Sequence, residues 1–236
     1  MYKANFRFRI KYLLLLIFVF AIQYNSQAQN INSGIKGGLN IAKTSLKIKY
    51  EEIQSKTGFN IYVFGDYNFT HTFSISTEAG YTQKGFKYAP PDYTYEGVKY
   101  SGTLNVNMNY IDITVSAKFR LAKGNVIPYL KIGPSLGIKV DDGVSSEGNA
   151  FDEFYNSGAI VNNLLIFIKN NSFGLKSGAG VAIGLNKKTS IIFEINYNFD
   201  LTEVYDTPEI FVGVYSWSRS EDVKNNVLEL SAGVQF

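Results

Sequence analysis

The sequence repeats one pattern eight times, a segment of about ten residues or more in which apolar and polar side chains alternate. A period of two indicates a β-strand, because successive side chains of a strand point to opposite faces of the sheet. The last segment, 226–236, shows the pattern most clearly, and its apolar members are Leu228, Leu230, Ala232, Val234 and Phe236. Strands of this kind fold into a sheet with one apolar and one polar face.

The other segments are 33–42, 57–69, 73–81 with a possible continuation toward Tyr88, 108–121, 126–140, 172–185 and 190–201. Long connections alternate with short ones, which lie near 70–72, 122–125 and 186–189. Even strand number with every short turn at one end is the arrangement of bacterial membrane barrels. The pattern therefore predicts an all-β fold, an eight-stranded antiparallel up-and-down transmembrane β-barrel. Pro134 inside one segment predicts a bulge or a local irregularity.

The first 28 residues differ from the rest of the chain. Four basic residues precede an apolar run at 13–22, and these are Lys3, Arg7, Arg9 and Lys11. The run is too short for a membrane helix, and Ser26-Gln27-Ala28 follows it with small residues at the −3 and −1 positions. We expect a signal peptide at 1–28 and a barrel domain at 29–236. The alternative, an uncleaved anchor, is disfavoured by the short run and the small-x-small site.

The formal net charge of +3 depends on that leader. Without its four basic residues, 19 of the 23 remain against 20 acidic residues. The chain contains no cysteine, which excludes disulfides, thiolate metal sites and a lipid-modified amino-terminal Cys. We expect no cofactor, no bound metal and no nucleic-acid partner.

Charged residues occupy the strand faces opposite the large apolar side chains. They are Lys36, Glu78, Asp112, Lys118, Arg120, Lys131, Lys176, Glu194 and Glu229. In a soluble barrel these charges would form a wet exterior. The signal segment and the terminal Phe236 favour the opposite reading, in which they line the lumen. After the leader no apolar segment reaches 18 residues, so only a closed barrel could cross a membrane.

The predicted lumen residues form a nearly balanced set of opposite charges. Eight strands enclose a space just wide enough for side chains, so paired charges would plug the barrel. The alternative interpretation, acid and base catalysis, is weaker because balanced pairs are more often structural. A channel is the second alternative, and it conflicts with the inward side chains of Tyr62, Phe64 and Tyr129.

Enzymatic activity is not expected. The only histidine, His71, falls in a predicted two-residue turn, and no HExxH motif, phosphate-binding glycine loop or cluster of metal ligands is present. The predicted role is structural or binding, through the long loops. Tyrosines at 88, 93, 95 and 100 would provide either a contact surface or an aromatic girdle at the membrane interface. The apolar segment 164–168 would extend neighbouring strands or pack on the rim.

Four short motifs resemble the PorT-like family of outer-membrane β-barrel proteins: 78–85 (EAGYTQKG), 110–113 (YIDI), 128–130 (PYL) and 133–135 (GPS). The resemblance covers 31–236, and Thr114 departs from it where such proteins often carry Pro. It implies a Gram-negative outer-membrane barrel similar to OmpA and OmpX, and an association of the namesake with protein secretion. A small channel, transport or secretion-associated barrel is therefore the alternative function.

The closing segment resembles the terminal strand that the barrel-assembly machinery reads as an address. The implied partners are outer-membrane lipids, that machinery, and an extracellular or secretion-system protein. The resemblance also implies a cell outer membrane location with both termini in the periplasm, and we expect a monomer.

Overall fold

The computed structural model describes residues 31–44, 52–89, 92–149, 169–186, 188–203, 211–212, 215–216 and 224–236. Their strands are β1 (Ile31–Thr44), β2 (Glu52–Asn68), β3 (Phe73–Ala89), β4 (Tyr93–Tyr95), β5 (Val98–Tyr100), β6 (Gly102–Arg120), β7 (Val126–Gly148), β8 (Asn171–Gly184), β9 (Ser190–Asp200), β10 (Phe211–Val212), β11 (Tyr215–Ser216) and β12 (Asn225–Gln235). Over these ranges no helix is long and apolar enough to cross a membrane.

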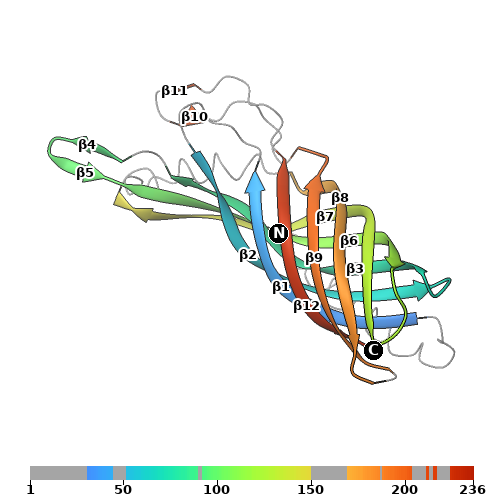
Figure 1. Cartoon of the computed structure of the whole chain (residues 1–236). Helices are drawn as coiled ribbons and strands as arrows, with labels where there is room; N and C mark the ends of the chain where they lie inside the picture. The colour runs from blue at the N-terminus through green and yellow to red at the C-terminus, as the bar shows by residue number, and fades with distance from the viewer. Residues whose placement is uncertain are drawn as a thin grey trace, which may run out of the picture.

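Eight of the strands form a closed antiparallel barrel in the order β1-β12-β9-β8-β7-β6-β3-β2 (Figure 1). Each predicted segment corresponds to one barrel strand, so the predicted fold class is confirmed. The first and last barrel strands close the sheet, with Gly37 opposite Ala232 near the middle of their ladder. Closure leaves no strand edge unpaired, which a wall in contact with lipid requires.

The two ends of the barrel differ in their connections. Short connections join β2 to β3, β6 to β7 and β8 to β9, and we call this the turn end. Backbone hydrogen bonds tighten two of these turns, from Phe69 N to Phe73 O at 3.1 Å and from Leu185 N to Thr189 O at 2.8 Å. The long connections all lie at the opposite end, which we call the loop end. The alternation predicted from the sequence is therefore present.

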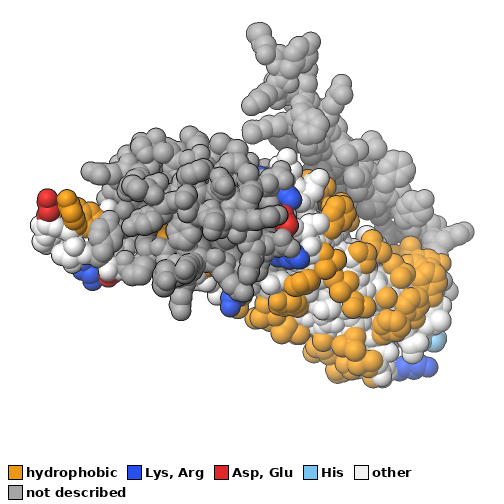
Figure 2. All heavy atoms as spheres, turned by 90° about the horizontal axis from the view of Figure 1, so that it is seen from above, with side chains coloured by type: hydrophobic (Ala, Val, Ile, Leu, Met, Phe, Trp, Pro, Cys, Tyr) orange, Lys and Arg blue, Asp and Glu red, His pale blue; other side chains and the backbone are white. Residues whose placement is uncertain are grey.

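The outer wall of the barrel is apolar. On β9 the outward side chains of Phe193, Ile195 and Tyr197 are 45–49% exposed, while the neighbouring inward residues are buried. Figure 2 shows hydrophobic side chains covering the visible part of the barrel wall. An apolar surface this continuous is unusual for a water-soluble monomer and suits contact with lipid.

Aromatic rings gather on the outer wall near the turn end. The ring centroids of Tyr67 and Phe69 are 4.9 Å apart, those of Phe69 and Phe73 are 5.7 Å apart, and those of Phe73 and Phe119 are 5.2 Å apart. Amphipathic and aromatic rings favour the boundary between hydrocarbon and head groups. This cluster lies at the opposite end of the barrel from the tyrosines that the sequence suggested as a girdle.

Four strands continue past the barrel at the loop end (Figure 1). The strands β6 and β7 contain 19 and 23 residues, about twice the length of a membrane-spanning strand. Their ladder continues to the pair Gly102–Gly148, and β3 pairs with β6 as far as Tyr88–Leu104. The prediction of loops over 90–107 and 141–171 is therefore wrong in part, because 102–107 and 141–148 are strand.

The extension begins at one row of residues across the sheet. Asn60, Thr82, Tyr110 and Lys139 are paired in sequence across β2, β3, β6 and β7. Register shifts fall beside this row in two ladders, between Ser55 and Asn60 and between Asn109 and Tyr110. Bulges bend and twist strands, so they mark where the extension leaves the barrel.

The polarity of the inward face inverts above that row. Inside the barrel this face carries charged and amide side chains, but its continuation in the extension is apolar and buried. The apolar members are Phe86, Leu104, Val106, Met108 and Val144. We call these four extended strands the loop-end sheet.

A separate hairpin, β4–β5, lies beyond the loop-end sheet, at the far left of Figure 1. Glu96 and Gly97 form its turn with positive φ of 49° and 79°, a backbone conformation that glycine tolerates best. Tyr95 and Val98 are paired across it, with 62% and 49% exposure. The tyrosines at 93, 95 and 100 thus belong to this hairpin and not to the barrel wall.

The strands β10 and β11 form a second two-stranded pair between β9 and β12. The apolar segment 164–168 lies outside the described residues. The register of β7 with β8 continues unbroken through Pro134, so no bulge is present there. The ladder of β7 with β6 has no pair at Gly133 and Pro134, which is a local irregularity of the kind predicted, and the register shift of β7 lies near Val140.

Candidate functional site: the charged lumen

Four charged side chains from four strands meet in the centre of the lumen. Lys36 contacts Glu78 at 2.6 Å and Glu194 at 2.5 Å. Lys131 contacts Glu194 at 2.7 Å and also forms an ion pair with Glu78. Each carboxylate thus lies between two ammonium groups, and all four side chains are at most 4% exposed. We call this set the central ring.

Two further ion pairs flank the central ring. Lys176 lies 2.8 Å from Glu229, and Lys118 lies 2.7 Å from Asp66. Aromatic rings pack against both ammonium groups, since Lys176 is 4.2 Å from the ring centroid of Tyr62 and Lys118 is 4.0 Å from that of Tyr129. The attraction between a cation and a ring face adds to each ion pair.

The tyrosine hydroxyls connect the ion pairs to the barrel wall. Tyr62 donates to Glu229 at 3.0 Å, and Tyr129 donates to Glu194 at 2.8 Å. A buried carboxylate is costly unless cations and hydrogen-bond donors surround it, and these two receive both. The side chains therefore support one another across the full width of the lumen.

A third charged group lies nearest the loop end and was missed in the sequence analysis. Lys84 lies 3.6 Å from Asp112 and 3.5 Å from Asp200, and all three are nearly inaccessible. Lys84 and Glu78 lie on the same strand and are separated by an even number of positions, so both side chains point to the same face. Continuing the alternation of that strand would therefore have placed Lys84 in the lumen. Within the described chain, Asp112 Oδ1 and Asp200 Oδ2 have no hydrogen-bond partner.

The structure brings together eight of the nine charged residues expected in the lumen. Arg120 is the exception, because it lies at the turn end, where its guanidinium donates to Asn68 Oδ1 and forms no ion pair with any described residue. Three acids and bases must be added to the set, namely Asp66, Lys84 and Asp200. The buried total is then five lysines and six carboxylates.

The other polar residues that the structure describes do not suggest a catalytic site or a metal site. His71 is exposed in the turn between β2 and β3, at the opposite end from the loop-end sheet. Where the structure describes the chain, no group of three or more His, Cys, Asp or Glu could hold a metal ion. Among the described residues, the contacts in the lumen are ion pairs, hydrogen bonds and cation–ring contacts.

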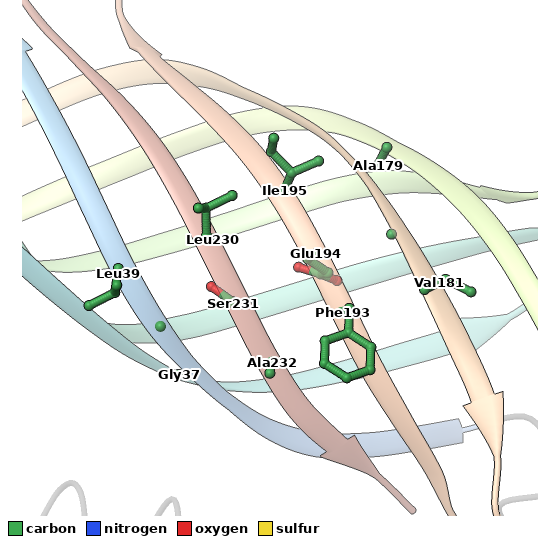
Figure 3. A pocket seen from close by; sticks show the side chains of 12 residues that line it. Gly37, Leu39, Ala179, Val181, Phe193, Glu194, Ile195, Leu230, Ser231 and Ala232 are labelled. Atoms are coloured by element: carbon green, nitrogen blue, oxygen red, sulfur yellow. The ribbon is translucent and has the colours of Figure 1, made fainter.

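A shallow depression of about 640 Å³ lies on the outer wall, across β1, β12, β9 and β8 (Figure 3). Small residues form its floor, including Gly37, Ala179 and Ala232, and larger side chains such as Phe193 and Leu230 stand beside them. Glu194 and Ser231 reach it only from the lumen side, where both are buried. The depression is part of the lipid-facing wall.

An apolar outer wall, a charged and ion-paired interior, closure by eight strands and short turns at one end define a bacterial outer-membrane β-barrel. Comparison with known families identifies the group more closely. The model of the family described as "Outer membrane protein beta-barrel domain" matches residues 25–206, and the chain belongs to this family. The outer membrane is therefore its location.

Comparison with solved structures finds outer-membrane proteins that are similar at low sequence identity. The outer membrane protein OprG from Pseudomonas aeruginosa is 14% identical with a TM-score of 0.50, over 87% of this chain and 95% of that one. Ail, the attachment invasion locus protein of Yersinia pestis, is 15% identical with a TM-score of 0.41, over 88% and 100%. Neisserial surface protein A is 18% identical with a TM-score of 0.42, over 86% and 95%. No curated protein sequence matches the chain.

Proposed function

We propose that this protein is a closed outer-membrane barrel that binds a partner through its loop end. The observation that carries the proposal is the loop-end sheet. Strands of 19 and 23 residues are far longer than a membrane crossing needs, so the sequence maintains an ordered surface outside the bilayer. The short turns are periplasmic in barrels of this kind, which orients the loop end toward the cell exterior and both termini toward the periplasm.

The interior supports a closed barrel and not a channel. Ion pairs connect β1, β3, β7 and β9 across the centre, and the rings of Tyr62 and Tyr129 fill the space beside them. An eight-stranded barrel leaves little room beyond such side chains. The same contacts argue against catalysis in the lumen, because each carboxylate of the central ring contacts both lysines, and the two negative charges balance the two positive ones.

Two narrower assignments are proposals as well. Kinship with the PorT-like barrels is supported by the four motifs, two of which contribute charged lumen residues, among them Glu78 and Asp112. Recognition of the closing strand by the assembly machinery is supported by its outward apolar residues, since Leu230, Ala232 and Phe236 are exposed along β12 and at its end.

Export is the first testable consequence. If 1–28 is a signal peptide, the mature protein begins at Gln29 and fractionates with the outer membrane. N-terminal sequencing of the protein from purified outer membranes is the measurement. Recovery from the inner membrane with Met1 retained would contradict the proposal, and Ala28→Arg is expected to block cleavage and leave the precursor.

Recognition through the loop end is tested by replacing the hairpin Tyr93–Tyr100 with a short Gly-Ser linker. Barrel closure does not use this hairpin, so refolding and heat-modifiable gel mobility are expected to match the wild type. Capture of a partner by intact cells is expected to be lost. A wider deletion that extends to Asn105 would also remove the pairs of Gly102–Asn105 with β7, so the deletion is limited to the hairpin.

A point substitution refines the same test. Tyr95→Ala removes an aromatic ring of the hairpin that is 62% exposed, while Lys99→Ala removes an exposed side chain that pairs with Asp92 at 2.8 Å. Partner capture is expected to fall with the first and persist with the second. Unchanged capture after removal of the entire hairpin would contradict a role for it in recognition.

A further inference from the structure

Arg120 is the one charged residue expected in the lumen that the structure leaves without a carboxylate. It is the last residue of β6, at the turn end, and its side chain is partly buried. One amino group donates to Asn68 Oδ1, which holds the guanidinium in place without neutralising it. A guanidinium has five N–H donors, so most of them are available to another acceptor.

A hollow of about 580 Å³ surrounds this guanidinium at the turn-end mouth of the lumen. Lys123 and His71 also line it, from the turns after β6 and β2. No Asp or Glu is among the described residues of its lining. Phe69 and Ile127 add apolar wall. The volume lies in the range of small-molecule sites.

The nearest lumen carboxylate does not compensate this positive charge. Asp66 lies 2.7 Å from Lys118 and accepts a hydrogen bond from Gln235 at 3.0 Å, so one of its oxygens is fully used. Among the described side chains that line the hollow, Arg120 and Lys123 are positive and no carboxylate side chain opposes them. Charges concentrated at a low-dielectric opening attract ions of opposite sign.

We propose that the turn-end mouth is a binding site for a small oxyanion, a carboxylate or a phosphate group. Arg120 engages it bidentately, because the planar fork of a guanidinium matches two oxygens of either group. Lys123 adds a point charge, and Asn68 fixes the orientation of the guanidinium. The orientation proposed above makes the ligand periplasmic, and only this compartment rests on the proposed function.

The test uses the full mature barrel refolded in zwitterionic micelles, so that the detergent supplies no competing charge. Inorganic phosphate and acetate are titrated separately, and binding is followed through the NMR resonance of the Arg120 side-chain Nε–H. Saturable shifts with at least one of the two anions are expected. Comparison of the two titrations identifies whether the site prefers phosphate or carboxylate.

Three variants test whether anion binding depends on Arg120. Arg120→Gln is expected to weaken binding at least about tenfold, as removal of a charge-assisted hydrogen bond does, with binding followed by the amide resonances of Lys123 and Gly124. Arg120→Lys keeps the charge but loses the bidentate geometry, so an intermediate loss is expected. Lys188→Gln removes the same charge from a different turn at the same end, outside the hollow, and is expected to leave binding unchanged.

Absence of saturable shifts with both anions would overturn the site. Equal weakening by Lys188→Gln and Arg120→Gln would also overturn it, because a general attraction to a basic rim would then suffice. If Arg120→Gln fails to refold, the comparison of Arg120→Lys with Lys188→Gln decides the matter. The titration does not depend on topology, so an inverted orientation in cells would refute the compartment and leave the site intact.

Discussion

Glu78→Gln is expected to lower the free energy of unfolding of the barrel by about 3–5 kcal/mol, the cost of breaking a buried ion pair from one side. Glu78 lies between Lys36 and Lys131, and the substitution leaves both ammonium groups with only Glu194. The side chains are almost fully excluded from solvent, so water cannot replace the lost carboxylate. Urea titration of the refolded barrel, read by the gel mobility shift, is the measurement.

The double variant Glu78→Gln with Lys131→Gln is the decisive control. It leaves the single balanced pair of Lys36 and Glu194, so its stability is expected to lie closer to wild type than that of Glu78→Gln alone. Asp92→Asn breaks the exposed pair with Lys99 on the hairpin and is expected to leave the urea midpoint nearly unchanged, because water screens this pair. Additive losses in the double variant would refute charge compensation within the ring.

Ile195→Arg is expected to destabilise the barrel by about 2–4 kcal/mol, as a cation at mid-depth of the lipid-facing wall does. Ile195 is the middle residue of β9, and it is 48% exposed between Ala179 and Leu230 of the neighbouring strands. The measurement is equilibrium unfolding from lipid bilayers. The cost arises from the bilayer, because the same position in water would tolerate the charge.

Leu201→Arg is the matched control for this prediction. It lies just past β9 on the same face and is 56% exposed, but at the loop-end rim. Charges near the interface cost only about 0–1 kcal/mol, so the two substitutions should separate clearly. Equal costs at 195 and 201 would show that the wall of β9 does not cross the bilayer as described.

The alternation of side chains was sufficient to predict the barrel. On β9, residues such as Phe193 and Glu194 fall on opposite sides of the wall, because a period of two assigns every residue of a strand once a single one is assigned. The pairing of short turns with long connections then fixed the order of the strands. Both signals are local, which explains why a single sequence carried them.

The loop-end sheet could not be predicted, because the pattern that identified the barrel reverses there. Along the inward face of β6, the residue changes from Asp112 to the apolar Val106 three positions further along that face, while asparagines occupy the other face. Where the strands leave the bilayer and their inward face is apolar, the alternation in one sequence does not distinguish the inward face from a lipid-facing one. The pairs that β6 forms with β7 in this sheet also join residues far apart in the chain, and Gly102 and Gly148 are 46 positions apart.

The charged lumen was predicted in composition but not in pairing. The alternation along each strand placed all four residues of the central ring on the inner side of the wall. Which of these side chains contact one another depends on the stagger of the strands around the barrel. The same stagger separates Arg120 from the carboxylates and places it at the turn end. Lys84 was missed because the residues of its segment were assigned to faces only as far as Tyr81, and the possible continuation toward Tyr88 was left unassigned.

The central claim is that ion pairs and aromatic rings close the lumen, and its most direct test is the conductance of the refolded mature barrel in planar lipid bilayers. If the central ring and the flanking pairs close the lumen as proposed, we expect no steady ion current at either polarity. Stable unitary conductance from the wild-type barrel, reproduced after reconstitution at high dilution, would contradict a closed lumen.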